Sequence, residues 1–180
     1  MTSKNRLAVQ DMVIFAMLGA LLLIGKILFE PLPNIHPLAS LIGVYTVTYR
    51  EKALIPIYVY VILQGLFSGF NMWWIPYTYI WTCLWALFMI IPRNIAKTRA
   101  LYIYPLICAL HGILFGTLYA PAQALIFGLN FSGMIKWIVA GLPFDLLHAG
   151  GNFVAGFLVL PLSNVLTKIT NKSWRQRRSK

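Results

Sequence analysis

The chain has 180 residues, of which 59% are hydrophobic and only 11% are charged, and its net charge at pH 7 is +11. Such a low charged fraction is typical of membrane proteins and argues against a soluble domain. The basic residues form no helical face interleaved with polar aromatic side chains, which argues against nucleic-acid binding. We therefore expect a single all-α integral membrane domain covering residues 1–180.

Six membrane-spanning helices are predicted at about residues 9–29, 38–49, 53–70, 73–91, 101–127 and 136–166, followed by a basic tail at 167–180. Residues 30–37 contain three prolines, which cannot continue a helix and therefore predict a loop. The second helix is short for a hydrocarbon layer of ~30 Å, so it is expected to be tilted or partly broken. Pro105 and Pro121 are expected to bend the fifth helix.

The basic residues predict the orientation of these helices. With six crossings, all of the 15 lysines and arginines except Lys26 and Lys136 fall on one side of the membrane. Short loops rich in Lys and Arg remain in the cytoplasm, so both termini are expected there. The tail at 167–180 is expected to contact anionic lipid or a cytoplasmic partner, with lipid as the first expectation. Cys83 and Cys108 lie inside apolar runs and are interpreted as small core residues.

Three polar residues at membrane depth are expected to share one helix face. Asp145, His148 and Asn152 follow one another at spacings of three and four residues. Ionisable side chains at this depth are costly and usually face the bundle interior. Two interpretations stay open: a ligand cavity or conformational latch, and a structural pair that locks the sixth helix to its neighbours. His111 is interpreted as an interior histidine.

A second group of polar and aromatic residues is predicted at the outer end of the bundle. Trp and Tyr at this level ordinarily form only the aromatic belt of a membrane protein. Here aromatic rings, amide groups and the outer loop gather at one end, which suits a pocket for a planar or amphipathic ligand. The group comprises Asn34, His36, Gln64, Trp73, Trp74, Tyr77, Tyr119 and Gln123.

Small residues form a patch on the first helix. Ala16 and Ala20 lie one turn apart, with Gly19 beside them. Such a patch permits another helix to approach closely, either within the bundle or from a partner protein.

Together these features resemble the substrate-binding S component of an energy-coupling factor (ECF) vitamin transporter. The resemblance lies in the Ala-xxx-Ala motif of Ala16 and Ala20 and in the Pro-Phe-Asp-Leu-Leu-His stretch at residues 143–148. The segments at 33–37 and 74–76 are also similar to stretches that recur among S components. The resemblance covers nearly the whole chain and is closest to the cobalamin-type S component of lactic-acid bacteria.

The resemblance implies a six-helix bundle in a bacterial cell membrane that captures a vitamin with high affinity. Ala16, Gly19 and Ala20 would dock on a transmembrane T component, and two cytoplasmic ATPases would bind ATP and Mg²⁺ and hydrolyse the ATP, so no cofactor is expected in this chain. Asn34, His36, Asp145 and His148 join the outer aromatic and amide residues as expected vitamin contacts. Cobalamin is the first expectation; folate, a pyrimidine or queuosine are the alternatives.

Three other classes of protein compete with this interpretation. The chain has four carboxylates and no paired acids placed for acid–base or metal chemistry, so we do not expect an enzyme. A self-sufficient secondary transporter is the main alternative, although two related halves are not evident. A scaffold whose aromatic residues merely anchor it in lipid is the third.

Overall fold

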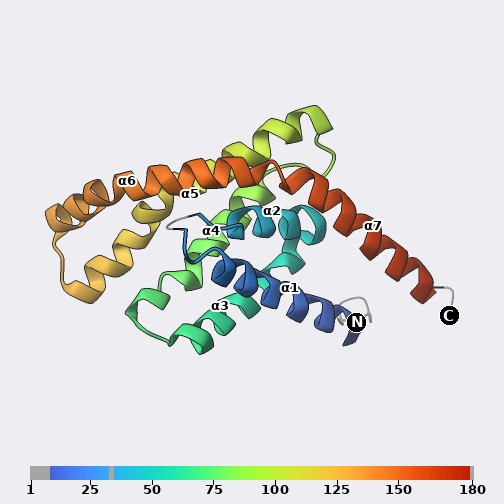
Figure 1. The fold of residues 1–180 in the computed structure, drawn as a ribbon, viewed down its shortest axis with the longest axis horizontal. Helices are drawn as coiled ribbons and strands as arrows, with labels where there is room; N and C mark the ends of the chain where they lie inside the picture. Colours follow the sequence, from blue (N-terminus) through green and yellow to red (C-terminus); the bar gives the residue numbers. More distant parts are fainter. Residues whose placement is uncertain (1–8, 33–34, 179–180) are drawn as a thin grey trace, which may run out of the picture.

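The computed structural model describes residues 9–32 and 35–178, and this part of the chain is helical without strands. Figure 1 shows a bundle from which the last helix extends as an arm. The helices are α1 (Val9–Leu28), α2 (Leu38–Tyr49), α3 (Leu54–Ser68), α4 (Tyr77–Met89), α5 (Lys97–Phe127), α6 (Phe131–Gly156) and α7 (Val159–Arg178). Short 3₁₀ turns at Arg50–Ala53 and Met72–Trp74 precede α3 and α4.

Four helical stretches in the described residues are long and apolar enough to cross a membrane. They are Val9–Leu28, Leu38–Ser68, Lys97–Phe127 and Phe131–Gly156. The second stretch combines α2, the 3₁₀ turn and α3. α4 has only 13 residues, which is short for a hydrocarbon layer of ~30 Å. The described part of the chain is thus all-helical, with four stretches long and apolar enough to be membrane spans, while the six-span arrangement and the cytoplasmic termini stay predictions.

The short helix α2 occupies the centre of the bundle. Nine of its 12 residues are buried, and they cover every face of the helix. It packs against α1, α4, α5, α6 and α7. A helix that is apolar all round is expected where protein surrounds it. The shortness of α2 is explained by this central position, because its ends need not reach both membrane surfaces.

The structure corrects the predicted sixth helix, 136–166. It begins earlier, at Phe131, and divides into α6 and α7 at the turn of Phe157 and Leu158. Pro161 explains the division, because it has no N–H to donate and its ring clashes with the carbonyl four residues earlier, that of Phe157. The predicted tail at 167–180 continues α7 to Arg178.

The basic turns gather at one end of the bundle. The Arg50 guanidinium donates to the carbonyls of Met89 at 2.7 Å and Ile91 at 3.0 Å, which joins the turn after α2 to the end of α4. The indole of Trp85 donates to the Arg50 carbonyl at 3.0 Å. In Figure 1 the start of α1 and the end of α7 lie on one side of the view, whereas the α3–α4 and α5–α6 connections lie on the other. Lys4, Arg6 and Lys180 lie outside the described residues.

We predict that the side-chain hydrogen bonds of Arg50 stabilise the bundle by more than its unfavourable backbone conformation destabilises it. Its φ of 56° is one that side-chain-bearing residues rarely adopt. Arg50→Ala removes both carbonyl contacts, keeps that cost, and is expected to destabilise the protein by roughly 1.5–3 kcal/mol. Arg50→Gly removes the same contacts but relieves the backbone, so its melting temperature in detergent should fall less. Arg99→Ala, an exposed arginine of α5, is the matched control. Equal melting temperatures for Arg50→Ala and Arg99→Ala would contradict the role.

Candidate ligand site

Aromatic rings from α4 and α5 surround the buried indole of Trp81. Trp81 lies on α4, and its ring centroid is 5.5 Å from Tyr77, 5.7 Å from His111 and 5.9 Å from Phe115. The spacing of four residues between Tyr77 and Trp81, and between His111 and Phe115, places each pair on one helix face. Aromatic residues of α4 and α5 therefore meet in a single cluster.

Histidines from two further segments complete this cluster. His36, just before α2, has its ring 5.0 Å from that of His148 on α6. The His148 ring is in turn 4.9 Å from Phe115 on α5. His36, Tyr77, Phe115 and His148 line a cavity of about 180 Å³ together with Lys26, Phe29, Glu30 and Leu32. This outer cavity thus joins the ends of α1, α2 and α4 to the interior faces of α5 and α6.

Buried polar atoms on the rings of this cluster have no hydrogen-bond partner in the described protein. They are His36 Nδ1, Trp81 Nε1, His111 Nδ1 and His148 Nε2, and further unpartnered atoms are Tyr60 Oη, Gln64 Oε1 and both amide atoms of Asn152. Buried polar atoms are normally paired, so each such atom calls for a partner. Their concentration on and around the rings described above marks a place where a polar, ring-shaped ligand or ordered water gains several hydrogen bonds.

The environment of His36 keeps its ring neutral. Burial lowers the pKa of His36 from 6.5 to about 3, and the nearby His148 ring and Lys26 charge act in the same direction. A neutral imidazole has one N–H donor and one nitrogen acceptor. At neutral pH, His36 is therefore able both to donate and to accept a hydrogen bond in the outer cavity.

Asp145 contacts the backbone of α5 and none of the outer-cavity residues by hydrogen bonds. The Gly116 N–H donates to Asp145 Oδ1 at 3.0 Å and to Oδ2 at 3.2 Å. Gly116 has no side chain, and a Cβ there would collide with the Asp145 carboxylate. A Cβ at Gly112 would similarly lie 2.7 Å from the Ala149 Cα. This geometry favours the structural interpretation of Asp145, in which its carboxylate joins α6 to α5.

The other predicted ligand residues are dispersed around the cluster. The indole of Trp74 donates to the Val61 carbonyl at 2.8 Å, and the buried Gln64 amide donates to Ser68 Oγ at 2.9 Å. The Tyr119 hydroxyl donates to the Trp73 carbonyl, and its ring stacks on Trp137. Trp73 and Tyr119 thus link the 3₁₀ turn before α4 to α5 and α6, while Gln64 belongs to α3 and Trp74 to the same 3₁₀ turn.

Two residues predicted to contact the ligand, Gln123 and Asn34, are not found among the described residues that line the outer cavity. Gln123 is half-buried near the end of α5 and is not among the residues that line the outer cavity. Asn34 lies outside the described residues.

The small-residue patch of α1 divides between two environments. A Cβ at Gly19 would lie 2.5 Å from Val59 Cγ1, so Gly19 allows α3 to pack closely against α1. Ala16 is exposed and Ala20 is half-buried. Gly19 therefore packs the bundle internally, and the exposed part of the patch is centred on Ala16.

Sequence reasoning did not assign Lys26, Glu30, Phe115 or Trp81 to the site. The signal for Phe115 was available, because it lies four residues after His111 and four before Tyr119 on one face of α5. Lys26 and Glu30 are likewise four residues apart at the end of α1. Their convergence with α4 and α6 depends on how the helices pack.

The outer cavity combines hydrogen-bonding rings with one cationic and one anionic side chain. Within the part of the chain that the structure describes, no group of three or more His, Cys, Asp or Glu side chains is arranged to hold a metal ion. Ring stacking and hydrogen bonding to a heteroaromatic compound are the interactions that these residues offer.

We predict that Gly116 is required for the α5–α6 contact. Gly116→Ala forces a methyl group into the Asp145 carboxylate and should lower the melting temperature of the purified protein by several degrees. Gly150→Ala on α6 is the matched control, since a Cβ there meets nothing within 4 Å and alanine favours helix. A Gly116→Ala protein as stable as Gly150→Ala would show that the close contact is dispensable.

We also predict a pH dependence that originates at His36. Because its pKa is about 3 in the folded protein against 6.5 unfolded, the unfolded chain binds the proton first as the pH falls. Stability contributed by neutral His36 is therefore full above pH 6.5 and is lost as the pH falls toward 3. His36→Gln should reduce the decrease in melting temperature between pH about 7 and about 5. An unchanged decrease would assign the pH dependence to other groups.

Comparison with known proteins adds no relative to this picture: the chain matches no protein-family model, no curated protein sequence and no solved structure at a significant level.

Proposed function

We propose that this protein is a substrate-binding subunit of the ECF S-component type, which captures a small heteroaromatic micronutrient at the outer cavity. The observation that carries the proposal is the pair of buried, unpartnered atoms His36 Nδ1 and His148 Nε2 on rings that line the outer cavity, with the unpartnered Trp81 indole 6.5 Å from the His36 ring. No side chain or backbone group of the described residues pairs with these atoms. A ligand with ring nitrogens and exocyclic polar groups satisfies them and stacks on the same rings.

The lining of the outer cavity favours a ligand with mixed polarity. Tyr77 and Phe115 provide aromatic surface, and the two histidines provide directional hydrogen bonds. Lys26 and Glu30 add one charge of each sign. This combination suits a neutral or zwitterionic ring better than a strongly charged or wholly apolar compound.

The size of the outer cavity favours a small ring over a corrinoid. Its volume of about 180 Å³ lies below the roughly 300–1,000 Å³ usual for drug-sized ligands. A compound of one or two rings needs only a modest opening of the cavity. Cobalamin, the first expectation from sequence, needs a much larger rearrangement, so we now place it behind pyrimidine-sized ligands.

The proposed partners are a transmembrane T component and two cytoplasmic ATPases in a bacterial cell membrane. Ala16 is exposed on α1, and Met12, Val13 and Met17 around it are exposed apolar residues. A surface of small and flexible apolar side chains permits close contact with a partner helix as well as with lipid. Contact with lipid would explain the exposure of these apolar residues equally well. The docking of a partner at Ala16 therefore rests on the proposed function.

A binding screen of the purified protein tests the proposal. The panel contains thiamin and its pyrimidine, pyridoxine, riboflavin, biotin, pantothenate, folate, queuine, cobinamide and cobalamin. We expect one small heteroaromatic compound to raise the melting temperature by mass action and to bind in direct titration. Tyr77→Ala and His148→Ala should each weaken that binding by about tenfold or more.

The matched control for the screen is Tyr102→Ala. Tyr102 is an exposed tyrosine of α5 that does not line the outer cavity, so its loss should leave affinity unchanged. If no compound binds, the proposed function is overturned. If cobalamin alone binds, the preference for a small ligand is wrong and the cavity must open widely.

Uptake measurements distinguish an S component from a self-sufficient secondary transporter. An S component should accumulate the identified ligand in cells only when the T component and both ATPases are produced with it. Uptake by this chain alone in liposomes would favour the secondary transporter instead.

A further inference from the structure

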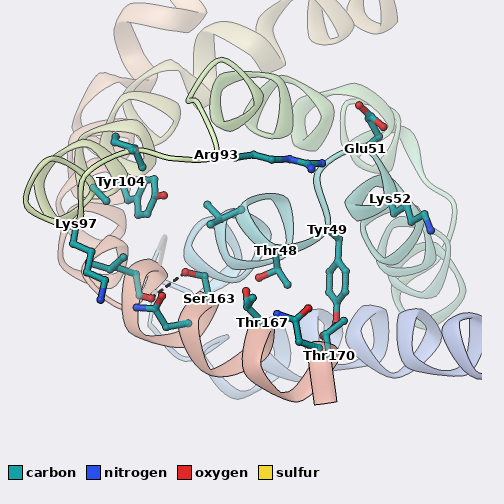
Figure 2. Close-up of a pocket in the computed structure, with 16 residues that line it drawn as sticks. Thr48, Tyr49, Glu51, Lys52, Arg93, Lys97, Tyr104, Ser163, Thr167 and Thr170 are labelled. Carbon is teal, nitrogen blue, oxygen red and sulfur yellow. Dashed lines mark hydrogen bonds between the residues drawn. The ribbon is translucent and has the colours of Figure 1, made fainter. Parts of the chain in front are cut away.

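A second and larger cavity lies at the basic end of the bundle, away from the outer cavity. Its volume is about 520 Å³, and it is lined by the end of α2, the following turn, the α4–α5 connection, the start of α5 and one face of α7. We call it the inner cavity, and Figure 2 shows its lining. The volume falls in the usual range for small-molecule sites. The proposed function makes no use of this space.

Positive charge predominates in the lining of the inner cavity. Lys52, Arg93 and Lys97 line it, against the single carboxylate of Glu51. In Figure 2 the Arg93 side chain extends along one edge, opposite the hydroxyl groups of α7. Lys97 is the first residue of α5, and the residue before it provides no side-chain cap for the helix. The positive end of the α5 dipole therefore adds to the charge of the side chains.

Hydroxyl groups form the opposite wall of the inner cavity. Ser163, Thr167 and Thr170 come from successive turns of α7. Tyr49 on α2 and Thr170 share a hydrogen bond of 2.9 Å, which joins the two helices at this wall. Figure 2 shows Thr48 and Thr167 beside that pair.

Thr48 supplies the observation that indicates a ligand. Its Oγ1 is buried on the cavity wall and has no hydrogen-bond partner in the described protein. By contrast, Thr46, which is also on α2, donates to its own backbone at the Ile42 carbonyl. A threonine close to a helix end could have made the same local bond, so the free hydroxyl of Thr48 is available to a bound group.

We propose that the inner cavity binds a phosphate group, carried either by an acidic phospholipid or by a soluble phosphate ester. A phosphate has several acceptor oxygens that point in different directions. Its oxygens can accept from Arg93 and Lys97, which lie at different edges of the cavity in Figure 2, and from the hydroxyl groups of Thr48 and Thr167. A singly charged carboxylate has fewer acceptor sites for donors that converge from α2, α5 and α7.

The test uses the full chain in nanodiscs of phosphatidylcholine. In one arm phosphatidylglycerol replaces part of the lipid; in the other, glycerol 3-phosphate is added to the buffer. The melting temperature and native mass spectrometry report stabilisation and bound molecules. We expect stabilisation in one arm, which identifies the source of the phosphate, and a weaker effect at high salt.

Four variants relate that stabilisation to the inner cavity. Arg93→Gln and Lys97→Gln should each weaken binding by about tenfold. Arg99→Gln removes the same charge from a residue of α5 that does not line the cavity, and it should bind normally. Thr48→Val should weaken binding without lowering the melting temperature of the unliganded protein, because the lost hydroxyl had no partner.

Two results would overturn the proposal. One is the absence of stabilisation in both arms. The other is an equal loss of binding in Arg99→Gln and Arg93→Gln with no effect of Thr48→Val, because that pattern describes general attraction between a basic surface and anionic lipid.

Discussion

The burial of α2 on every side is the constraint on which the rest of the structure depends. A helix surrounded by other helices must pair its polar side chains within the protein, because neither water nor lipid headgroups reach them. Ser40 and Thr46 donate to carbonyls within or just before α2, and Tyr45 donates to the Leu18 carbonyl of α1. Thr48 departs from this pattern, and it lies where α2 reaches the inner cavity.

Close packing at α2 also determines how its neighbours lie. A Cβ at Gly43 would meet the ring of Phe88, so the absence of a side chain there lets α4 pack directly on α2. Arg50 then accepts an unusual backbone conformation at the end of α2 and joins it to the end of α4. The α5–α6 pair is held in a comparable way, by glycines that admit the backbone and side chains of the facing helix.

The two ends of α2 differ in chemistry. His36 precedes α2 in an environment of aromatic and histidine rings, whereas Thr48 and Tyr49 at its other end face basic and hydroxyl groups. At ~1.5 Å per residue a helix of 12 residues is only about 18 Å long. One short buried helix thus separates the outer cavity, where we propose a heteroaromatic ligand, from the inner cavity, where we propose a phosphate group.

The sequence by itself determined the helical membrane class, the approximate helix positions, the concentration of basic residues in alternate loops, and the common face of Asp145, His148 and Asn152. These properties follow from composition, proline and charge position, and helical periodicity, all of which are local along the chain. Pro161 in the sequence also indicates the division of the last helix, although the predicted helix 136–166 included this proline without a break.

Only the tertiary structure decided which of these residues meet. It separated Trp74 and Gln64 from the outer cavity, added Lys26 and Phe115, paired Asp145 with the Gly116 backbone, and formed the inner cavity between α2, α5 and α7. The physical reason is that helices apolar on all faces carry little periodic signal for their rotation. The contacts between these helices depend on close approach at positions such as Gly43 and Gly116. Such an approach requires a small residue on one helix and a matching side chain or backbone on the other.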